Sequence, residues 1–455
     1  MNEYDAILIG TGQATGTLVA GLVKLGQKVA VIERDRVGGT CVNWGCTPTK
    51  TIVASARAAH MVRRAGDFGI EVPEFSINFN RVVERQNAIR NSNSEGLRKY
   101  LQEVADFHEG SAAFISDSEV QVGEQTLRGS RIYIHTGARA RKPDIVGVGT
   151  VPYLDNRGIL ALEELPEHLI VVGGSYIGLE FSQAFRRFGS RVTVLERSPR
   201  IMPREDEDIA SEACAILADE GVDIICHTQI TALHPGPSGG VAVRFQHDGT
   251  ERTVSGSHLL LATGRVPNTE DLNLPAAGVE TDERGFIQVN DQLQTNVPHI
   301  YAVGDVNGRS AFTHTSVHDG QVILRNLNGE DWKASDRIMI YSMFIDPPLG
   351  RVGMNEAQAR GSGRKVLSAT MPMSRIARAR EKDETRGLVK FLVDANSKEI
   401  LGAAILGVGG DEIINGIAAW MYTGLPYTDF QRAVLVHPTV AELMPWVFEN
   451  LKPLA

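Results

Sequence analysis

A short apolar stretch near the start of the chain is followed at once by a glycine-rich turn. Residues 4–9 are mostly apolar, which indicates a buried strand of a parallel sheet. After the turn, an apolar helical pattern extends to Leu25, and a second apolar stretch over residues 28–32 ends at Glu33. A strand, a glycine turn, a helix, a strand and an acid in this order are typical of a dinucleotide-binding unit.

The residues of this turn have separate expected roles. Gly10 allows the tight turn, and Gly12 lets backbone N–H groups approach a pyrophosphate at the start of the helix. Glu33 is placed to accept hydrogen bonds from ribose hydroxyls. The third glycine of the usual pattern is replaced by Thr15, which we expect to shift the helix–strand packing slightly without removing the site.

The same pattern occurs a second time. Residues 169–172 form an apolar stretch, a turn with Gly173 and Gly178 follows, and another apolar stretch over residues 191–195 ends at Glu196. The middle glycine of this turn is replaced by a serine, which is small enough for the backbone approach. Two such units in one chain imply two bound dinucleotides.

The rest of the chain shows a different balance of helices and strands. Two long helical stretches are predicted between the two units, over residues 52–66 and 80–106. After residue 335 the pattern changes to alternating strands and apolar helices, at residues 388–393, 402–407, 411–423 and 440–451.

Composition narrows the class of protein. A chain of 455 residues with 42% hydrophobic residues is expected to form two to four domains. Its net charge of −9, from 46 basic and 55 acidic residues, argues against nucleic acid or an anionic membrane as partner. The first strand begins by residue 4 and no apolar run reaches the length of a membrane span, so we expect a cytoplasmic protein without signal peptide or membrane anchor.

Two cysteines follow the first dinucleotide unit closely. Cys41 and Cys46 are separated by four residues, and five helical steps rise about 7.5 Å, beyond the roughly 7 Å limit for an unstrained bridge. A disulfide would need an irregular turn, which Gly45 and Pro48 allow. Two reduced buried cysteines are the alternative; zinc is not favoured, since no second Cys/His pair stands at ligand spacing, and no metal site is predicted. The adjoining dinucleotide unit favours redox chemistry and a flavin, which exchanges electrons with thiols and nicotinamides.

Four motifs in a fixed order carry a family resemblance. The chain resembles the class I pyridine nucleotide–disulfide oxidoreductases, which include glutathione reductase, dihydrolipoamide dehydrogenase and mercuric reductase. The resemblance extends from Tyr4 to about Phe448 and rests on the motifs at residues 38–50, 262–265, 300–305 and 437–442.

The resemblance implies an α/β fold with a defined domain order. It implies two Rossmann-like dinucleotide-binding domains, one for FAD and one for NAD, and a C-terminal α+β dimerisation domain. The predicted boundaries are residues 1–145 and 264–330 for the FAD domain, 146–263 for the NAD(P) domain and 335–455 for the dimerisation domain. The expected assembly is a homodimer with shared active sites.

The resemblance also assigns catalytic roles. Cys46 is implied to be the thiolate beside the flavin, and Cys41 the thiol that attacks the substrate. Cys41 needs a nearby base, for which His437 is the candidate, with Glu442 orienting its imidazole. Taken alone, these two residues are better explained as a loop histidine and a helix N-terminal acid; the cysteine motif favours the catalytic role. By resemblance His437 reaches the cysteines of the other subunit.

Further residues are implied to contact the cofactors. Lys50 and Glu180 are implied to form an ion pair near the flavin, Asp305 to bind its ribityl chain, and Tyr176 to cover the nicotinamide pocket. The FAD contacts implied besides Gly10, Gly12, Glu33, Lys50 and Asp305 are Gly39, Thr40, Ala113, Thr136, Gly137 and Thr313. The NAD contacts implied besides Gly173, Tyr176, Gly178 and Glu196 are Ile177 and Gly264.

The choice between NADH and NADPH depends on the end of the second unit's second strand. Glu196 can accept both hydroxyls of an unmodified ribose and would repel a 2′-phosphate. Arg197, Arg200 and Arg204 follow, and an arginine nearby can accommodate that phosphate. Glu196 stands at the end of the strand, where the ribose is bound, so NADH is predicted as the cofactor and NADPH is the alternative.

The sequence does not identify the electron acceptor. Dihydrolipoamide dehydrogenases carry His-x-His-Pro where this chain has Leu435 before His437, and glutathione reductases carry basic residues where it has Glu196. The mercuric reductase type resembles the chain most, but the C-terminal residues 450–455 lack its cysteine pair. We expect a small disulfide, a metal ion or an oxidant such as hypothiocyanous acid as acceptor. Dihydrolipoamide dehydrogenase or glutathione reductase activity is the alternative within the enzyme class. A non-catalytic flavin-binding regulator is the alternative class, which is opposed by the joint presence of the catalytic residues Cys41, Cys46, Lys50, Glu180, His437 and Glu442.

Overall fold

The structure, a computed structural model, describes residues 2–454. The chain divides into two compact units. Unit 1 comprises the chain up to Thr51, Asn80–Lys142 and Thr263–Arg337; unit 2 comprises Ile52–Phe79, Pro143–Ala262 and the chain from Ile338 onward. The segments predicted as the nicotinamide and dimerisation domains both belong to unit 2.

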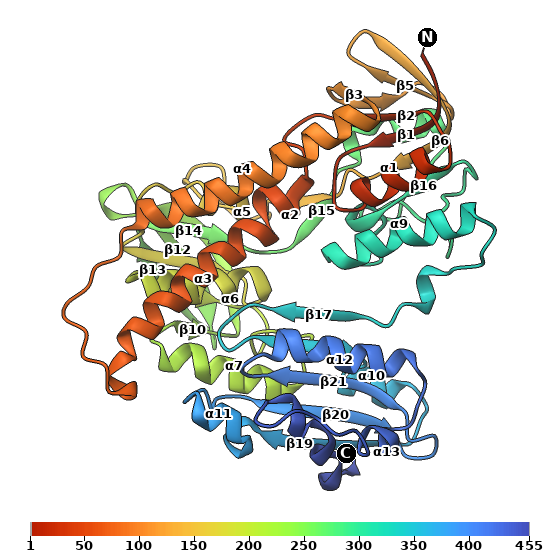
Figure 1. The fold of residues 1–455 in the computed structure, drawn as a ribbon. Helices are drawn as coiled ribbons and strands as arrows, with labels where there is room; N and C mark the ends of the chain where they lie inside the picture. The colour runs from red at the N-terminus through yellow and green to blue at the C-terminus, as the bar shows by residue number, and fades with distance from the viewer. Residues whose placement is uncertain (1, 455) are drawn as a thin grey trace. The chain divides into compact units, whose positions relative to one another are not determined.

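Unit 1 is built on a mainly parallel sheet with the strand order β3-β2-β1-β6-β5-β4, in which β16 also pairs with β6 (Figure 1). The strands β2, β1, β6 and β16 pair in parallel, and β6, β5 and β4 are antiparallel. The strand bounds are β1 Asn2–Ile9, β2 Val29–Glu33, β3 Asp106–Glu109, β4 Ala112–Phe114, β5 Glu119–Val122, β6 Gln125–Ile134 and β16 Ile300–Ala302.

Both faces of this sheet are buried, as the continuous apolar run of its first strand predicts. Ala6 and Leu8 of β1 pack on the face covered by helices α1 (Ala14–Lys24) and α9 (Thr313–Leu327), while Ile7 and Ile9 pack on the opposite face. The carboxyl end of β1 leads directly into the glycine turn, so the turn lies at the sheet edge where ligands of such folds bind.

Unit 2 contains a second parallel sheet with the order β10-β9-β8-β14. An antiparallel sheet of β11, β12 and β13 packs against it through a shared apolar core. The bounds are β8 His168–Val172, α6 Tyr176–Phe188, β9 Arg191–Leu195, α7 Glu207–Asp219, β10 Asp223–Ile225, β11 Thr228–Pro235, β12 Val241–His247, β13 Thr250–Gly256 and β14 His258–Leu261.

The C-terminal part of unit 2 is an antiparallel sheet with the order β17-β18-β21-β20-β19-β22. Helix α12 (Gly410–Tyr422) packs its apolar residues against the core strands of this sheet. The bounds are β17 Ile340–Met343, β18 Leu349–Gly353, β19 Val366–Pro372, β20 Leu388–Asp394, β21 Ile400–Leu406 and β22 Lys452–Pro453.

Most predicted elements are present. The last predicted helix, over residues 440–451, is present as a contiguous helical run of three short pieces: a 3-10 turn over Ala441–Leu443, the α-helix α14 (Met444–Val447) and a second 3-10 turn over Phe448–Asn450. Pro445 lies in the first turn of α14, where its missing backbone N–H interrupts no hydrogen bond within that helix.

The two long predicted helices are present as α3 (Cys46–Arg63) and α4 (Phe79–Val104). Helix α3 begins six residues before its predicted start, at the second cysteine of the pair. The shorter elements are α2 Gly39–Trp44, β7 Ala138–Ala140, α5 Asn156–Leu160, β15 Arg265–Pro267, α8 Leu274–Ala277, α10 Glu356–Gly361, α11 Ala377–Glu381 and α13 Tyr427–Phe430. Within residues 2–454, every helix is too short or too polar to span a membrane.

Candidate active site

The two cysteines flank a break between two helices. Cys41 lies in α2, and Cys46 is the first residue of α3. Gly45 separates them with φ −144° and ψ −117°, and a Cβ at this position would lie 2.9 Å from the carbonyl oxygen of Thr40. The irregular turn that a Cys41–Cys46 disulfide would need is therefore present, and it is centred on Gly45.

The two thiols are not joined in a disulfide, and they interact with each other. A hydrogen bond to Cys46, then burial and then negative charge on Cys46 raise the pKa of the Cys41 thiol. Cys46 lies at the N-terminus of the 18-residue helix α3 and 3.3 Å from the hydroxyl of Thr313, and both features stabilise a thiolate. Of the two thiols, Cys41 is therefore the one that holds its proton more strongly.

A cleft in unit 1 collects most of the residues predicted to contact FAD. Lys50 and Ala113 do not line it; Ala112, one residue earlier in β4, does, because side chains alternate along a strand. The predicted residues along the cleft are Gly10, Gly12, Glu33, Gly39, Thr40, Cys41, Cys46, Thr136, Gly137, Asp305 and Thr313.

The glycine turn of this cleft has the geometry that a dinucleotide requires. Gly10 has φ +101°, and a Cβ there would collide with the carbonyl oxygen of His135. Gly39 has φ +62°, and a Cβ there would lie 3.0 Å from the Cα atom of Gly12. Glu33 accepts the N–H of Thr11 at 2.9 Å and lines the same cleft. These residues fit FAD, which would lie along a concave wall of glycine backbone and N–H donors.

Thr15 replaces the usual third glycine without opening the turn. It is fully buried, and its hydroxyl lies 3.2 Å from the carbonyl oxygen of Gly10, to which it donates. The same hydroxyl lies 3.1 Å from Nδ1 of His135. The small packing shift that we expected at Thr15 is thus accommodated by polar contacts.

His135 is a buried cleft residue that the sequence did not single out. Its Nδ1 contacts Thr15 and its Nε2 lies 2.9 Å from the hydroxyl of Ser316. Because the Thr15 hydroxyl donates to Gly10, Nδ1 carries the imidazole proton and Nε2 accepts from Ser316. One signal was available: His135 directly follows β6, which pairs in parallel with β1, so it occupies the same sheet edge as the glycine turn.

The buried imidazole predicts a pH dependence of stability. Burial lowers the pKa of His135 from 6.5 to about 4. Between these values the unfolded state binds a proton that the folded state lacks, so the free energy of unfolding falls as the pH drops from about 6.5 to 4, by about 3 kcal/mol. Thermal unfolding of FAD-free protein at pH 4.5 and 7.0 should show this loss, and His135→Asn should reduce it. The exposed His227→Asn is the control; equal pH dependence in wild type and His135→Asn would contradict the assignment.

The second glycine turn repeats the arrangement of the first. Gly173 has φ +116°, and a Cβ there would collide with the carbonyl oxygen of Ala262. Glu196 accepts the N–H of Gly174 at 2.6 Å through one oxygen and the N–H of Ser198 at 2.7 Å through the other. Gly178 packs against the carbonyl of Gly173, where any side chain would collide. Unit 2 therefore holds a dinucleotide turn with an acid at the strand end.

The remaining predicted nicotinamide residues follow this turn. Tyr176 is the first residue of α6, the side chain of Ile177 is exposed, and Glu180 is buried and accepts the N–H of Phe344 at 2.8 Å. Lys50 and Gly264 belong to unit 1, so the predicted Lys50–Glu180 ion pair and the role of Gly264 stay predictions.

His437 and Glu442 form the predicted pair. Nδ1 of His437 lies 3.0 Å from both carboxylate oxygens of Glu442. Because a carboxylate only accepts, Nδ1 carries the proton and Nε2 is left for proton exchange with another group. The His437 side chain is 75% exposed and that of Glu442 13%, so the acid is fixed within the chain while the imidazole is open to a partner.

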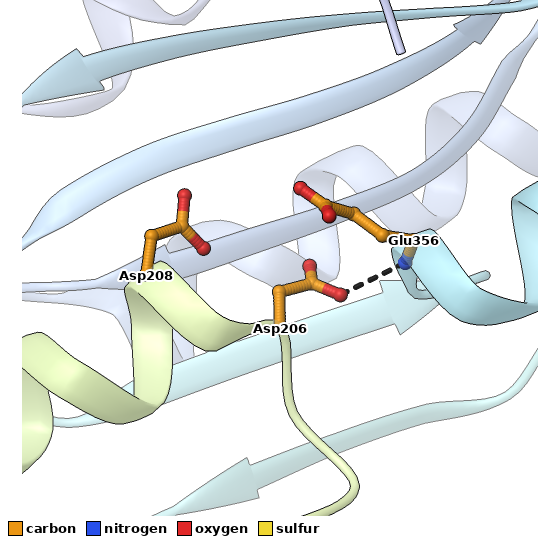
Figure 2. Close-up of side chains that lie close together, drawn as sticks. All are labelled: Asp206, Asp208 and Glu356. Carbon is orange, nitrogen blue, oxygen red and sulfur yellow. Dashed lines mark hydrogen bonds between the residues drawn. The ribbon is translucent and has the colours of Figure 1, made fainter. Parts of the chain in front are cut away.

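One group of carboxylates has the spacing of a metal site. Asp206, Asp208 and Glu356 place one oxygen each within 4.8 Å of one another (Figure 2). The ammonium of Lys390 lies among them, 2.6 Å from Asp208 and 3.7 Å from Asp206, and pairs with Glu356. The lysine supplies the positive charge that a metal would bring, so the group carries no metal proposal.

Comparison with known proteins assigns the family. Residues 4–320 match the family described as "Pyridine nucleotide-disulphide oxidoreductase", and residues 339–448 match the dimerisation domain of the same family. The chain belongs to the pyridine nucleotide-disulphide oxidoreductases.

Individual relatives cover nearly the whole chain. It is 38% identical to the probable pyridine nucleotide-disulfide oxidoreductase RclA of Escherichia coli (strain K12), over 99% of this chain and 100% of that one. It is 31% identical to the mercuric reductase of Bacillus cereus, over 97% and 70% of the two chains. The solved Cu(II) complex of the HOCl-induced flavoprotein disulfide reductase RclA from Escherichia coli superposes with a TM-score of 0.90 at 37% identity, covering 99% of each chain.

These matches confirm the predicted family, fold class and enzyme class. The protein is a flavoprotein disulfide oxidoreductase with FAD and a pyridine nucleotide as cofactors, and its C-terminal part is a dimerisation domain.

Proposed function

We propose that this enzyme uses NADH to reduce a Cys41–Cys46 disulfide and passes the electrons to a small oxidant or to Cu(II). The observation that carries the proposal is the position of both thiols on the wall of the glycine-lined cleft, in hydrogen-bond contact with each other. FAD, when bound, supplies the two-electron carrier between the nicotinamide and the thiol pair.

The thiol chemistry follows from the unequal protonation of the pair. Cys41 loses its proton to the His437 imidazole of the second subunit and attacks the electrophilic atom of the acceptor, whose leaving group takes the bonding electrons. The Cys46 thiolate then attacks the sulfur of Cys41, which releases the reduced acceptor and forms the Cys41–Cys46 disulfide. The Cys41 thiol and the Cys46 thiolate have together lost two electrons and the one proton that His437 took, and the acceptor has gained the two electrons. Cu(II) would take them one at a time, as two ions per disulfide.

Three features support a small acceptor of this kind. The solved RclA structure, 37% identical to this chain, is described as HOCl-induced and as a Cu(II) complex. Leu435 stands where dihydrolipoamide dehydrogenases carry a histidine, and the C-terminal residues lack the cysteine pair of mercuric reductases. Trp44, between the cysteines, is half-buried, and Cζ of Arg90 lies 4.9 Å from the centroid of its ring. The tryptophan therefore narrows the approach of an acceptor to the cysteines.

An acceptor panel tests the proposal. Anaerobic NADH should first give a long-wavelength charge-transfer absorbance from the thiolate beside the flavin. Turnover should then be fastest with hypothiocyanous acid or Cu(II), and slow with lipoamide, glutathione disulfide and Hg(II). Lipoamide as the best acceptor would instead assign dihydrolipoamide dehydrogenase activity. Absence of the absorbance in FAD-loaded protein would favour a non-redox flavin protein.

The nucleotide preference gives a separate prediction. Glu196 is buried at the strand end, where its charge would repel a 2′-phosphate. We expect wild type to prefer NADH, and Glu196→Gln to shift the NADH/NADPH ratio of kcat/KM toward NADPH by on the order of tenfold, because one unfavourable charge is removed. Steady-state kinetics with both nucleotides measure this, with the exposed Glu207→Gln as the charge-matched control. A wild-type preference for NADPH would overturn the argument.

A further inference from the structure

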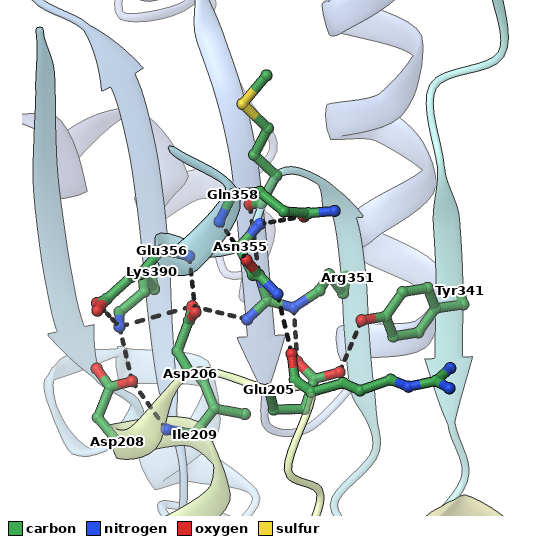
Figure 3. A network of polar contacts seen from close by, with 12 residues as sticks. Glu205, Asp206, Asp208, Ile209, Tyr341, Arg351, Asn355, Glu356, Gln358 and Lys390 are labelled. Carbon is green, nitrogen blue, oxygen red and sulfur yellow. Dashed lines mark hydrogen bonds and ion pairs between the residues drawn. The ribbon is translucent and has the colours of Figure 1, made fainter. Parts of the chain in front are cut away.

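In the part of the chain that the structure describes, one buried arginine lacks the acidic partners that the other buried arginines have. Arg351 is held by Glu205 at 2.6 Å and by Asp206 at 2.7 Å (Figure 3). Arg187 is likewise paired with two carboxylates. Arg90 is only 9% exposed, yet it forms no ion pair within the described residues, and its Nε is buried without a hydrogen-bond partner. A buried guanidinium is costly unless a negative charge compensates it.

The side chain of Arg90 lies over an aromatic ring of the cysteine motif. Arg90 belongs to α4, and its Cζ is 4.9 Å from the centroid of the Trp44 ring. The ring attracts a cation but has no net charge, so the positive charge stays uncompensated. Trp44 follows Cys41 by three residues in α2, and residues three apart on a helix have Cβ atoms about 5–6 Å apart. The guanidinium therefore lies close to the face of α2 that carries the attacking thiol.

A second arginine adds positive charge at the same place. Nη2 of Arg36 donates to Oδ1 of Asn91, the residue next to Arg90 in α4. Arg36 is half-buried and also forms no ion pair among residues 2–454. Burial, followed by the charge of Arg36, lowers the pKa of Arg90, although a guanidinium stays protonated at any ordinary pH. Two positive charges thus lie close together, and within the described chain no carboxylate pairs with either.

The loop that carries Arg36 is fixed to its surroundings. Ser94 of α4 donates to the carbonyl of Val37 at 2.7 Å. The side-chain amide of Asn43, in α2, donates to the carbonyl of Val37 at 3.0 Å and to that of Arg36 at 3.3 Å. The loop is therefore tied both to α4 and to the cysteine helix. Neither arginine is among the residues along the FAD cleft, so the phosphates of FAD do not supply the missing negative charge.

We propose that Arg36 and Arg90, with the ring of Trp44, form a binding site for a small, weakly hydrated monovalent anion beside Cys41. This inference rests on the proposed function and narrows its acceptor to an oxidant that releases such an anion when it is reduced. A guanidinium is itself weakly hydrated, and a strongly hydrated anion would lose more hydration free energy at a half-buried site. Among the acceptors expected for this enzyme, hypothiocyanous acid releases an anion of this kind, thiocyanate.

The release of thiocyanate follows from the two steps of the thiol chemistry. The Cys41 thiolate attacks the sulfur of hypothiocyanous acid, and hydroxide leaves with the electrons of the S–O bond and takes up a proton to form water. The Cys46 thiolate then attacks the Cys41 sulfur, and thiocyanate leaves with the electrons of the S–S bond formed in the first step. Its negative charge appears beside Cys41, where the two guanidiniums can bind it.

Titration calorimetry with sodium thiocyanate at constant ionic strength tests the site in the oxidised, FAD-loaded dimer. We expect wild type to bind one thiocyanate per chain. Arg90→Met should weaken this binding by on the order of tenfold or more, because a hydrogen bond between charged groups is lost. Arg36→Met removes the second guanidinium and should also weaken binding, so the site stays testable if Arg90→Met folds poorly.

Arg98, in the same helix, provides the matched control. Its Cζ lies 5.6 Å from the centroid of the Phe107 ring, but its charge is already paired with Glu109. Arg98→Met should therefore leave thiocyanate binding unchanged.

The other outcomes separate the site from the proposed function. Absence of thiocyanate binding in wild type, or equal binding in wild type, Arg36→Met and Arg90→Met, would overturn the anion site and leave the proposed function to the acceptor panel. Binding that depends on Arg90, in an enzyme that does not turn over hypothiocyanous acid, would keep the anion site and overturn its role in the proposed function.

Discussion

Replacing Cys41 with serine is expected to lower turnover with any thiol-dependent acceptor by at least about 10³-fold, because the attacking nucleophile is lost. Cys46 would remain as a lone thiolate at the N-terminus of α3, near the hydroxyl of Thr313. The oxidised, FAD-loaded variant should therefore show the charge-transfer absorbance without added NADH. Reduction by NADH and slow leakage of electrons to oxygen or quinones should survive.

The reciprocal variant is the control for this assignment. Cys46→Ser should lose turnover as well, but without the absorbance in the oxidised state, because the remaining Cys41 is a protonated thiol. If Cys46→Ser gave the absorbance and Cys41→Ser did not, the roles of the two cysteines would be reversed.

Replacing His437 with alanine is expected to slow turnover by about 10²–10⁴-fold, the usual contribution of a positioned acid–base group. The loss follows because Cys41 keeps its proton: its pKa is raised by Cys46 and by burial, and His437 is the base assigned to it. FAD content and reduction by NADH should stay close to wild type. Glu442→Gln should give a smaller loss, because it weakens the orientation of the imidazole and leaves the base present.

A mixing experiment tests whether the histidine comes from the second subunit. The His437 side chain is 75% exposed, and the adjacent Val434 and Val436 are 99% and 75% exposed, as expected of a surface that a second copy covers. Cys41→Ser chains mixed with His437→Ala chains should form about half mixed dimers, each with one intact site. Activity should then approach about a quarter of wild-type sites. No recovery after demonstrated subunit exchange would mean that the site is built within one chain.

The dinucleotide turns were predictable because each is decided by neighbours along the chain. Each turn needs a glycine with positive φ after a buried strand and an acid at the end of the next strand. Both requirements concern residues close together in the chain, so they can be recognised directly in the sequence. Glu33 and Glu196 accordingly accept the backbone N–H groups of their own turns. The break at Gly45 between the cysteines follows from their spacing in the same way.

Other features depended on contacts between residues far apart in the chain. Arg351 meets Glu205 across 146 positions, and His135 meets Ser316 across 181, so no local pattern marks either pair. The pattern of residues 440–451 marks a helical stretch, but not its division into a short α-helix and two 3-10 turns. Short motifs thus sufficed to predict the family and the fold class, and they indicate the chemistry proposed for the thiols. The partners of the buried polar groups were decided only by packing, because a buried donor or acceptor must find whichever group the folded chain brings beside it.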